Sequence, residues 1–269
     1  MPFRCFILSA RANYRVNSLS SQPTALTTRS SGQVFIQEGF RWDDQRAYLF
    51  DIDGTLLRSR DRVHVDSFFS SVRTVMGHEL VLDGVVLSGN TDPGILRDAF
   101  RLAQLDDELW QPHLKNVLET MRRDVLARRA EMRLVKMPGV DEMLEHLQGK
   151  GAALGVATGN LESIGWLKIE VLGLRHWFSF GGFSDSYDVR SEMIAHAMQQ
   201  ALRHAGPEAT VCVVGDTPAD ITAAQANGLP CIAVATGNFS FDQLMEHEPE
   251  VCATSLEALL QTVESRNIA

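Results

Sequence analysis

The stretch Asp51-Ile52-Asp53-Gly54-Thr55-Leu56-Leu57 decides how this chain is interpreted, because two carboxylates follow directly after an apolar run. Residues 47–50 are rich in strand formers, and the glycine and threonine that follow end the run, which predicts a buried strand leading into a loop. Residues i and i+2 of a strand share a face, so Asp51 and Asp53 start side by side. Two negative charges at such a short distance repel each other unless a cation or a shared proton stabilises them. The stretch therefore predicts a reactive site with a cation, although alone it is also compatible with an inert Asp-Gly turn.

Two further apolar runs end in polar residues of a similar kind. Residues 210–214 lead into Gly215-Asp216-Thr217-Pro218-Ala219-Asp220, and residues 152–157 end at Thr158-Gly159-Asn160. Pro218 suits the first turn of a helix, where the helix dipole also favours a negative charge such as that of Asp220. Three buried strands with such tips predict one site at the carboxyl edge of a parallel sheet.

Helical patterns alternate with these strands along most of the chain. The expected helices span residues 65–76, 92–105, 106–132, 161–172, 191–204 and 255–263, with a further strand over 231–235. The first three helices interrupt the alternation directly behind the first acidic strand. This order predicts an α/β fold with a doubly wound, Rossmann-like parallel sheet and an inserted all-helical domain. We divide the chain into an N-terminal extension (1–45), an α/β core (46–60 and 136–269) and a helical cap (61–135).

Taken in order, DxDGT, a strand ending in Thr, a Lys on the next helix and GDxxxD resemble the haloacid dehalogenase-like superfamily of aspartate-nucleophile phosphohydrolases, from about Arg46 onward. The resemblance implies that Asp51 is the nucleophile that forms an aspartyl-phosphate. It implies that Asp53 is the general acid, which later activates water, and that Thr158 binds the phosphoryl group. Mg²⁺ would be held by Asp51, the backbone carbonyl of Asp53 and Asp216, with Asp220 as a supporting acid; hard oxygen ligands suit this ion.

The transferring phosphoryl group also requires a fixed cation and hydrogen-bond donors. Lys168, the basic residue of the predicted helix 161–172, is the first candidate, although its chain could instead snorkel to water. Arg190 is the second candidate, because the Lys-Pro that many relatives carry after a later strand is missing here. Gly54, Gly159 and Asn160 are expected near the phosphate, and capping of the helix would equally explain Asn160.

The segment Ser88-Gly89-Asn90-Thr91-Asp92-Pro93 resembles one that dips toward the substrate in the phosphoglycolate phosphatase-like branch of the family. We list Asn90 and Thr91 as candidate substrate-binding residues on that basis. Thr91 and Asp92 are equally ordinary N-cap residues for the following helix. Related enzymes frequently place Lys or Met where Asn90 stands, so their substrate preference is not carried over.

Composition limits which partners and which cellular compartment are compatible with the chain. The 269 residues carry a formal net charge of −9, which disfavours a nucleic-acid partner, and contain no stretch long enough to span a bilayer. The cysteines show no CxxC spacing, which favours a reducing compartment without disulfides or zinc. The first 40 residues are rich in arginine and serine and resemble a transit peptide. We favour a non-functional extension of a cytoplasmic protein over targeting. The sequence does not indicate an oligomeric state.

The leading hypothesis is a Mg²⁺-dependent phosphatase that hydrolyses a small phosphorylated metabolite, of phosphoglycolate or sugar-phosphate type, through phosphorylated Asp51. A phosphosugar mutase on the same core and a catalytically silent metabolite-binding protein are the alternatives. A true haloacid dehalogenase needs neither a metal nor a second acid, so Asp53 and the Asp216/Asp220 pair argue against it.

Overall fold

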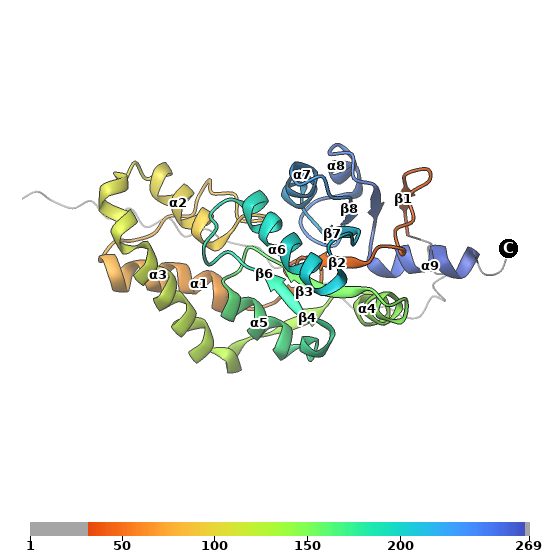
Figure 1. Cartoon of the computed structure of the whole chain (residues 1–269). Coiled ribbons are helices and arrows are strands. Elements are labelled where there is room, and N and C mark those ends of the chain that lie inside the picture. The colour runs from red at the N-terminus through yellow and green to blue at the C-terminus, as the bar shows by residue number, and fades with distance from the viewer. Residues whose placement is uncertain (1–31, 267–269) are drawn as a thin grey trace, which may run out of the picture. The chain divides into compact units, whose positions relative to one another are not determined.

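A seven-stranded sheet forms the centre of the computed structural model, which describes residues 32–266 (Figure 1). The strand order is β1-β9-β8-β7-β2-β5-β6, and all neighbours are parallel except the edge strand β1, which runs antiparallel to β9. The strands span β1 Val34–Ile36, β2 Ala47–Phe50, β5 Ala153–Ala157, β6 Phe180–Gly182, β7 Val211–Gly215, β8 Cys231–Val234 and β9 Val251–Ala253.

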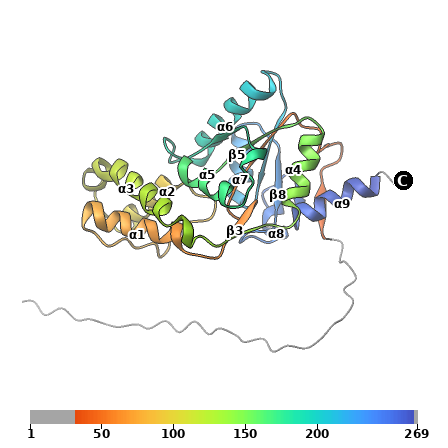
Figure 2. The same cartoon turned by 90° about the horizontal axis from the view of Figure 1, so that it is seen from below.

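Helices cover both faces of this sheet (Figures 1 and 2), as the alternation of the sequence predicted. Successive residues of a strand face opposite sides. Tyr48 and Phe50 of β2 therefore pack with α4 and α9, whereas Ala47 and Leu49 pack with α6, α7 and α8. The predicted doubly wound α/β fold is confirmed. The helices of the core span α4 Val140–Gly149, α5 Glu162–Val171, α6 Arg190–Ala205, α7 Pro218–Ala226, α8 Phe241–Met245 and α9 Leu256–Arg266.

The strand order changes direction at β2. The chain continues from β2 to β5 and β6 on one side, and then returns to the other side of β2 for β7, β8 and β9. Phe50 of β2 is paired with Val214 of β7, so the residues that follow these two strands emerge next to each other. Open α/β sheets bind ligands at such a switch point, outside the carboxyl ends of the strands.

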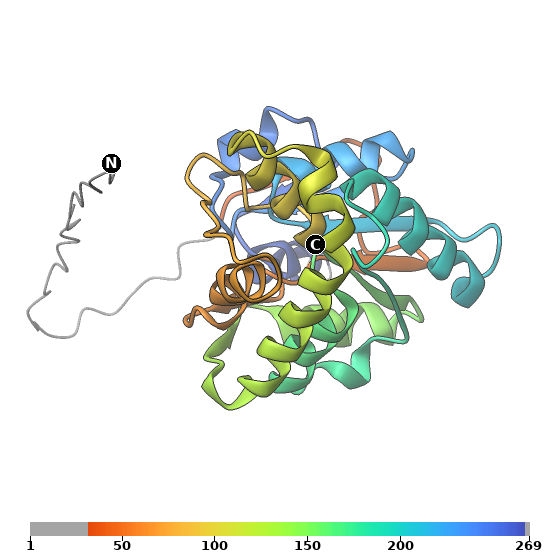
Figure 3. The same cartoon turned by 90° about the vertical axis from the view of Figure 1, so that its left-hand side faces the viewer.

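Three helices are inserted between β3 (Leu57–Ser59) and β4 (Leu134–Lys136), which pair with each other as an antiparallel ribbon. This helical insertion has its own apolar core, which includes Phe68, Leu96 and Met121 and also receives side chains from α5. Figure 3 views the protein from the side of the insertion, with α1 and α3 in front. Its helices span α1 Val63–Met76, α2 Asp92–Leu102 and α3 Asp107–Ala127, so the predicted third helix ends earlier than expected.

The predicted boundary of the N-terminal extension at residue 45 is wrong for the part that the structure describes. Strand β1 pairs with β9, and Trp42 is fully buried in the core. Asp43 accepts a hydrogen bond from the Lys150 ammonium at 2.8 Å. Composition averaged over the first 40 residues gave no sign of this pairing, because the partner strand lies more than 200 positions away. Residues 1–31, with the transit-peptide-like composition, lie outside the described part.

The described cysteines, Cys212, Cys231 and Cys252, are buried and carry free thiols. Burial raises the pKa of each thiol above its usual value. Within residues 32–266, none of the helices combines the length and apolar character needed to cross a membrane.

Replacing Trp42 tests whether the segment before β2 belongs to the folded core. We expect Trp42→Ala to lower the free energy of unfolding by about 3–5 kcal/mol, because it leaves a cavity in a fully packed site. Phe35→Ala is the control: Phe35 lies on the edge strand and is 38% exposed, and its loss is expected to cost about 1 kcal/mol or less. Urea unfolding measures both values, and equal destabilisation by the two substitutions would contradict the packing of Trp42.

Candidate active site

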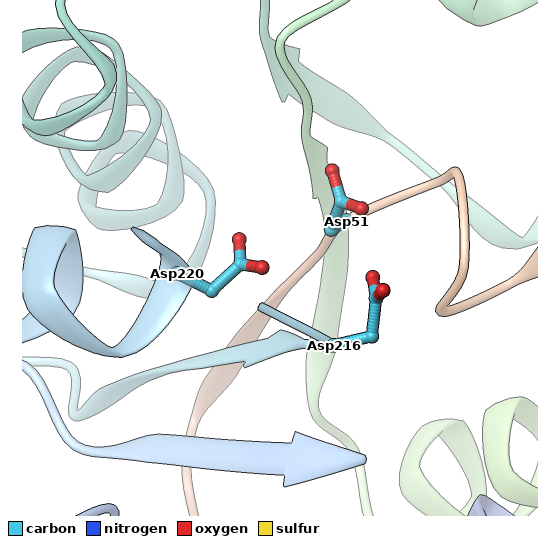
Figure 4. A group of neighbouring side chains, drawn as sticks. All are labelled: Asp51, Asp216 and Asp220. Atoms are coloured by element: carbon cyan, nitrogen blue, oxygen red, sulfur yellow. The ribbon is translucent and has the colours of Figure 1, made fainter. Parts of the chain in front are cut away.

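Three buried carboxylates meet at the switch point of the sheet (Figure 4). Asp51 follows β2, Asp216 follows β7, and Asp220 lies in the first turn of α7. One carboxylate oxygen from each lies within 4.8 Å of the others. The convergence expected from the sequence is therefore present, and it brings together residues about 165 positions apart because β2 and β7 are neighbours in the sheet.

These carboxylates carry more negative charge than their surroundings neutralise. Burial, with the charge of Asp220 and Asp53 adding to it, raises the pKa of Asp51 to about 7. Burial and the charges of Asp51 and Asp220 raise the pKa of Asp216 to about 9. Such shifts mean that burial and the repulsion between the carboxylates outweigh the positive charge beside them. A buried set of hard oxygen ligands with an excess of negative charge fits Mg²⁺.

Arg190, at the start of α6, is the cation that the structure places among these acids. Its Nη2 donates to Asp51 Oδ1 at 3.0 Å, and its Nε donates to Asp220 Oδ1 at 3.1 Å. The guanidinium side chain is only 8% exposed, and the nearby carboxylates hold its pKa above the usual value despite its burial. Arg190 therefore fixes the orientation of Asp51 directly.

Asp220 differs from the other two acids because both of its oxygens are already bound. Its Oδ1 accepts from Arg190, and its Oδ2 accepts from the backbone and the hydroxyl of Thr217 in a capping box. Asp216 accepts a hydrogen bond from Thr55 at 3.1 Å on Oδ1. These contacts favour Asp51 and Asp216 as metal ligands and favour Asp220 as the supporting acid that orients Arg190. They do not favour Asp220 as a direct ligand.

Asp53 lies in a different electrostatic environment from Asp51. Its side chain is 41% exposed, and it accepts hydrogen bonds from Lys168 Nζ at 2.6 Å and from Asn160 Nδ2 at 2.8 Å. Partial burial opposes ionisation, but the Lys168 ammonium outweighs it and holds the pKa of Asp53 below its ordinary value. Neighbouring carboxyl groups whose pKa values are pushed apart are typical of sites with separate acid–base roles.

Lys168 belongs to a polar network that joins the core to the insertion. It is 3% exposed and donates to Asn160 Oδ1 at 2.7 Å. It also lies 3.1 Å from His64 Nδ1, and an ammonium group can only donate, so that nitrogen accepts. The other ring nitrogen of His64, Nε2, lies 3.2 Å from Asp92 Oδ2.

His64 was missed by the sequence analysis. The eight histidines form no metal-binding pattern along the chain, so none of them stands out as a site residue. The available signal was its position in the first turn of a helix that begins shortly after DxDGT. Local sequence does not indicate which face of that helix meets the core.

The predicted glycines permit close approach of the backbone around the acids. Gly54 has φ of +97°, and a Cβ there would lie 2.3 Å from an oxygen of Asp216. A Cβ on Gly159 would lie 2.1 Å from the carbonyl oxygen of Asn90. Thr158, between β5 and this glycine, is 1% exposed, and its hydroxyl accepts from the Asn160 amide.

The structure corrects the predictions for two side chains. Thr91 does not line the cavity: its hydroxyl accepts from Gly94 N and donates to the Asp188 carbonyl, each at 3.0 Å, so the N-cap alternative is right. Asn160 does not cap α5, whose N-cap residue is Leu161.

The prediction that Asn90 binds substrate is supported by its position and not by its hydrogen bonds. It lines the cavity, but its amide group is engaged inside the insertion, with the backbone of Val86 and Thr91 and with Asp98.

A cavity of about 300 Å³ lies above the acids and includes residues of both the core and the insertion. The core supplies Asp51, Asp53, Gly54, Thr158, Gly159, Asn160, Lys168, Arg190, Asp216 and Thr217, among others. The insertion closes it from the other side. Asn238 Nδ2 donates to Ser88 Oγ at 2.8 Å, and a Cβ on Gly89 would lie 2.6 Å from the Thr217 hydroxyl.

Comparison with known proteins agrees with this architecture. The family model described as "Haloacid dehalogenase-like hydrolase" matches residues 48–234, which is more than half of the chain. A phosphoglycolate phosphatase of Xanthomonas campestris is 30% identical over 220 residues, which cover 77% of this chain and 94% of the relative. A 5'-nucleotidase of Pseudomonas aeruginosa is 28% identical over 222 residues, which cover 81% and 95%.

Solved structures show the same fold. A crystal structure of a predicted phosphatase from Clostridium acetobutylicum superposes with a TM-score of 0.62 at 20% identity, covering 82% of this chain and 99% of the other. At that identity the likeness supports the fold alone. The family model and the similar phosphatases support more: this chain belongs to the haloacid dehalogenase-like hydrolase family, and the resemblance to its phosphoglycolate phosphatase-like branch is confirmed.

Proposed function

We propose that this protein is a Mg²⁺-dependent phosphatase that transfers the phosphoryl group of a small phosphorylated metabolite to Asp51 and then to water. The observation that carries the proposal is the buried cluster of Asp51, Asp216 and Asp220 around a single guanidinium. Similar proteins named phosphoglycolate phosphatase and 5'-nucleotidase support a small phosphate monoester as substrate.

The donor set fits Mg²⁺, which would be held by Asp51, Asp216 and the backbone carbonyl of Asp53. When bound, the ion supplies positive charge that stabilises the ionised carboxylates and the oxygens of the transferring phosphoryl group. Mg²⁺ usually keeps several waters, so few protein ligands are sufficient.

Asp51 is positioned to attack. Its backbone amide donates to the Val214 carbonyl at 2.8 Å, and Arg190 holds one carboxylate oxygen, so the side chain has a fixed direction. Phosphoryl transfer depends mainly on in-line positioning and on neutralising charge. The Arg190 guanidinium and the Thr158 hydroxyl line the cavity beside Asp51 and supply donors for the phosphoryl oxygens.

Asp53 is the proposed general acid and base. Lys168 holds its carboxyl in the ionised form in the resting site. A phosphate dianion that enters next to Asp53 repels this charge and raises its pKa, which promotes uptake of a proton. Protonated Asp53 then donates to the leaving oxygen, and the resulting carboxylate accepts a proton from the attacking water.

The helical insertion serves as the cap of this site. It covers the cavity through Ser88 and Gly89, and exclusion of water strengthens the electrostatic interactions inside. Opening and closing of the cap would admit substrate and release phosphate.

Substitution of the nucleophile tests the central assignment. We expect Asp51→Asn to reduce phosphate release from an aryl phosphate by at least about 10⁴-fold, because an amide does not form the acyl phosphate. Asp141→Asn, an exposed acid paired with Lys136, is the control and should retain activity. Comparable turnover by Asp51→Asn would refute the nucleophile. Phosphate release without any added sugar bisphosphate separates hydrolysis from a mutase reaction.

The proton donor is tested by varying the leaving group. Asp53→Asn should slow hydrolysis of an alkyl phosphate by about 10²–10⁴-fold, since an alkoxide leaves poorly without a proton. Hydrolysis of 4-nitrophenyl phosphate should fall much less, because nitrophenolate leaves without protonation. Asp51→Asn should impair both substrates equally. Equal losses in Asp53→Asn would show that Asp53 does not protonate the leaving group. Steady-state kcat/KM values decide between these outcomes.

The excess of negative charge predicts that stability depends on pH and that Mg²⁺ reduces this dependence. The pKa values of Asp51 and Asp216, at about 7 and about 9, lie above the ordinary value of an aspartate, so the folded state retains protons that the unfolded chain releases. In EDTA, stability should therefore fall as pH rises from 6 to 8, by about 1.4 kcal/mol per pH unit for each retained proton.

Saturating Mg²⁺ should make this pH dependence shallower, because the cation stabilises the ionised carboxylates. Asp216→Asn in EDTA should do the same, whereas Asp141→Asn should keep the slope of the wild type. Urea unfolding at pH 6, 7 and 8 measures these slopes, and identical slopes with and without Mg²⁺ would argue against a cation at the acidic cluster.

A further inference from the structure

The loop of residues 183–189 joins β6 to α6 and ends directly before Arg190. Arg190 is the first residue of α6, and its guanidinium donates to Asp51 Oδ1 at 3.0 Å. Asp188 lies only two positions before Arg190 in the chain. The course of the backbone at Asp188 therefore decides where α6 begins and from where the Arg190 side chain reaches toward Asp51.

The helical insertion holds Asp188. Arg97 of α2 donates from Nη1 to Asp188 Oδ2 at 2.7 Å and to the Asp188 carbonyl at 3.2 Å. The Thr91 hydroxyl donates to the same carbonyl at 3.0 Å. A Cβ on Gly94 would lie 2.8 Å from that oxygen, so α2 approaches the loop closely. Within residues 32–266, the hydrogen bonds of the Asp188 side chain and carbonyl all come from the insertion.

A second arginine of the insertion holds an earlier part of the same loop. Arg122 of α3 donates from Nη2 to Asp185 Oδ1 at 2.6 Å. Asp185 is also anchored to the core, because its Oδ2 accepts from the backbone amide of Glu162 at 2.7 Å. The position of Asp185 thus depends less on the insertion than the position of Asp188 does.

Neither arginine is placed to act on the substrate directly. Arg97, Arg122 and their aspartate partners in the loop do not line the cavity above the acids. The side chains of Arg97 and Asp188 are 19% and 49% exposed, and an ion pair with this much access to solvent contributes little to stability. The pair does fix the distance between α2 and the residue two positions before Arg190.

We propose that Arg97 is a positioning residue of the reaction: through Asp188 it fixes the start of α6, and thereby the contact of Arg190 with Asp51. The inference rests on the proposed phosphatase function, in which Arg190 orients Asp51 and donates to the phosphoryl oxygens. Phosphoryl transfer depends on such positioning, because small displacements from the in-line geometry slow it strongly. The insertion then contributes to catalysis through the backbone of the core, without touching the substrate.

Single substitutions on α2 test the role of Arg97. We expect Arg97→Gln to lower kcat/KM for 4-nitrophenyl phosphate with Mg²⁺ by about tenfold or more. Arg97→Lys should restore most of the activity, because one nitrogen of Arg97 makes both contacts with Asp188 and an ammonium group can also donate twice. Arg101→Gln is the control: it removes the same charge from an exposed residue in the last turn of α2 and should change kcat/KM by less than about twofold. The midpoints of urea unfolding of Arg97→Gln and Arg101→Gln should agree, which excludes a loss of activity through unfolding.

Two double variants test whether the effect passes through Asp188 and Arg190. Arg97→Gln combined with Asp188→Asn should lose no more activity than either single substitution, because the two residues share one contact. Orthovanadate mimics the transferring phosphoryl group, and calorimetry measures its binding in inactive variants as well. Arg97→Gln should weaken vanadate binding by about tenfold in the wild-type background. In the Arg190→Gln background the same substitution should have no further effect.

The outcomes separate this inference from the function on which it rests. Equal kcat/KM values for Arg97→Gln and Arg101→Gln would overturn the inference and leave the phosphatase assignment intact. A loss of vanadate binding that persists in full in the Arg190→Gln background would show that Arg97 acts on the insertion alone, and would likewise overturn the positioning of Arg190. If the wild-type protein with Mg²⁺ releases no phosphate from any ester, the proposed function fails, and the inference fails with it.

Discussion

The excess of buried negative charge at the carboxyl ends of β2 and β7 is the constraint on which the rest of the site depends. Asp51 and Asp216 are brought together by the pairing of two adjacent strands, and Arg190 neutralises only part of their charge. Burying like charges next to each other is unfavourable, so this cluster lowers the stability of the folded protein. The sheet holds them there, and its apolar layers on both faces supply the stability that this arrangement requires.

The two buried cations, Arg190 and Lys168, contact different aspartates of the DxDGT motif. Arg190 contacts Asp51 and Asp220, whereas Lys168 contacts Asp53 and reaches His64 in the insertion. Arg190 lies beside Asp51, the proposed nucleophile, and Lys168 lies beside Asp53, the proposed acid. Through His64 and Asp92, Lys168 also links the acid to the position of the insertion.

Close approach between the insertion and the core depends on small residues. Gly89 lies against Thr217, and Gly159 lies against the backbone of Asn90, at distances that leave no room for a Cβ. The insertion thereby closes the cavity with several apolar side chains and with Asp61, His64 and Asp92.

Most of the core was predictable because its signals are local. Apolar runs, a Pro at the first turn of a helix and paired aspartates identify strands, helices and strand tips within a few residues, and the parallel arrangement brings the tips to one edge. The predictions failed where a residue's role depends on contacts with distant segments. Strand β1 and Trp42 escaped notice because their partners lie at the far end of the chain, and Thr91 fits two roles equally well until its hydrogen bonds are seen.

The sequence by itself determined the α/β class, the helical insertion and the identity of Asp51, Asp53 and Asp216 as the residues of interest, since residue type and spacing suffice for these. Only the tertiary structure decided which acid each cation meets, that His64 joins the network, and which side chains of the insertion line the cavity. These contacts depend on where side chains on separate helices and strands point. The physical reason is that packing between distant segments fixes the direction of a side chain, and no local sequence pattern encodes that packing.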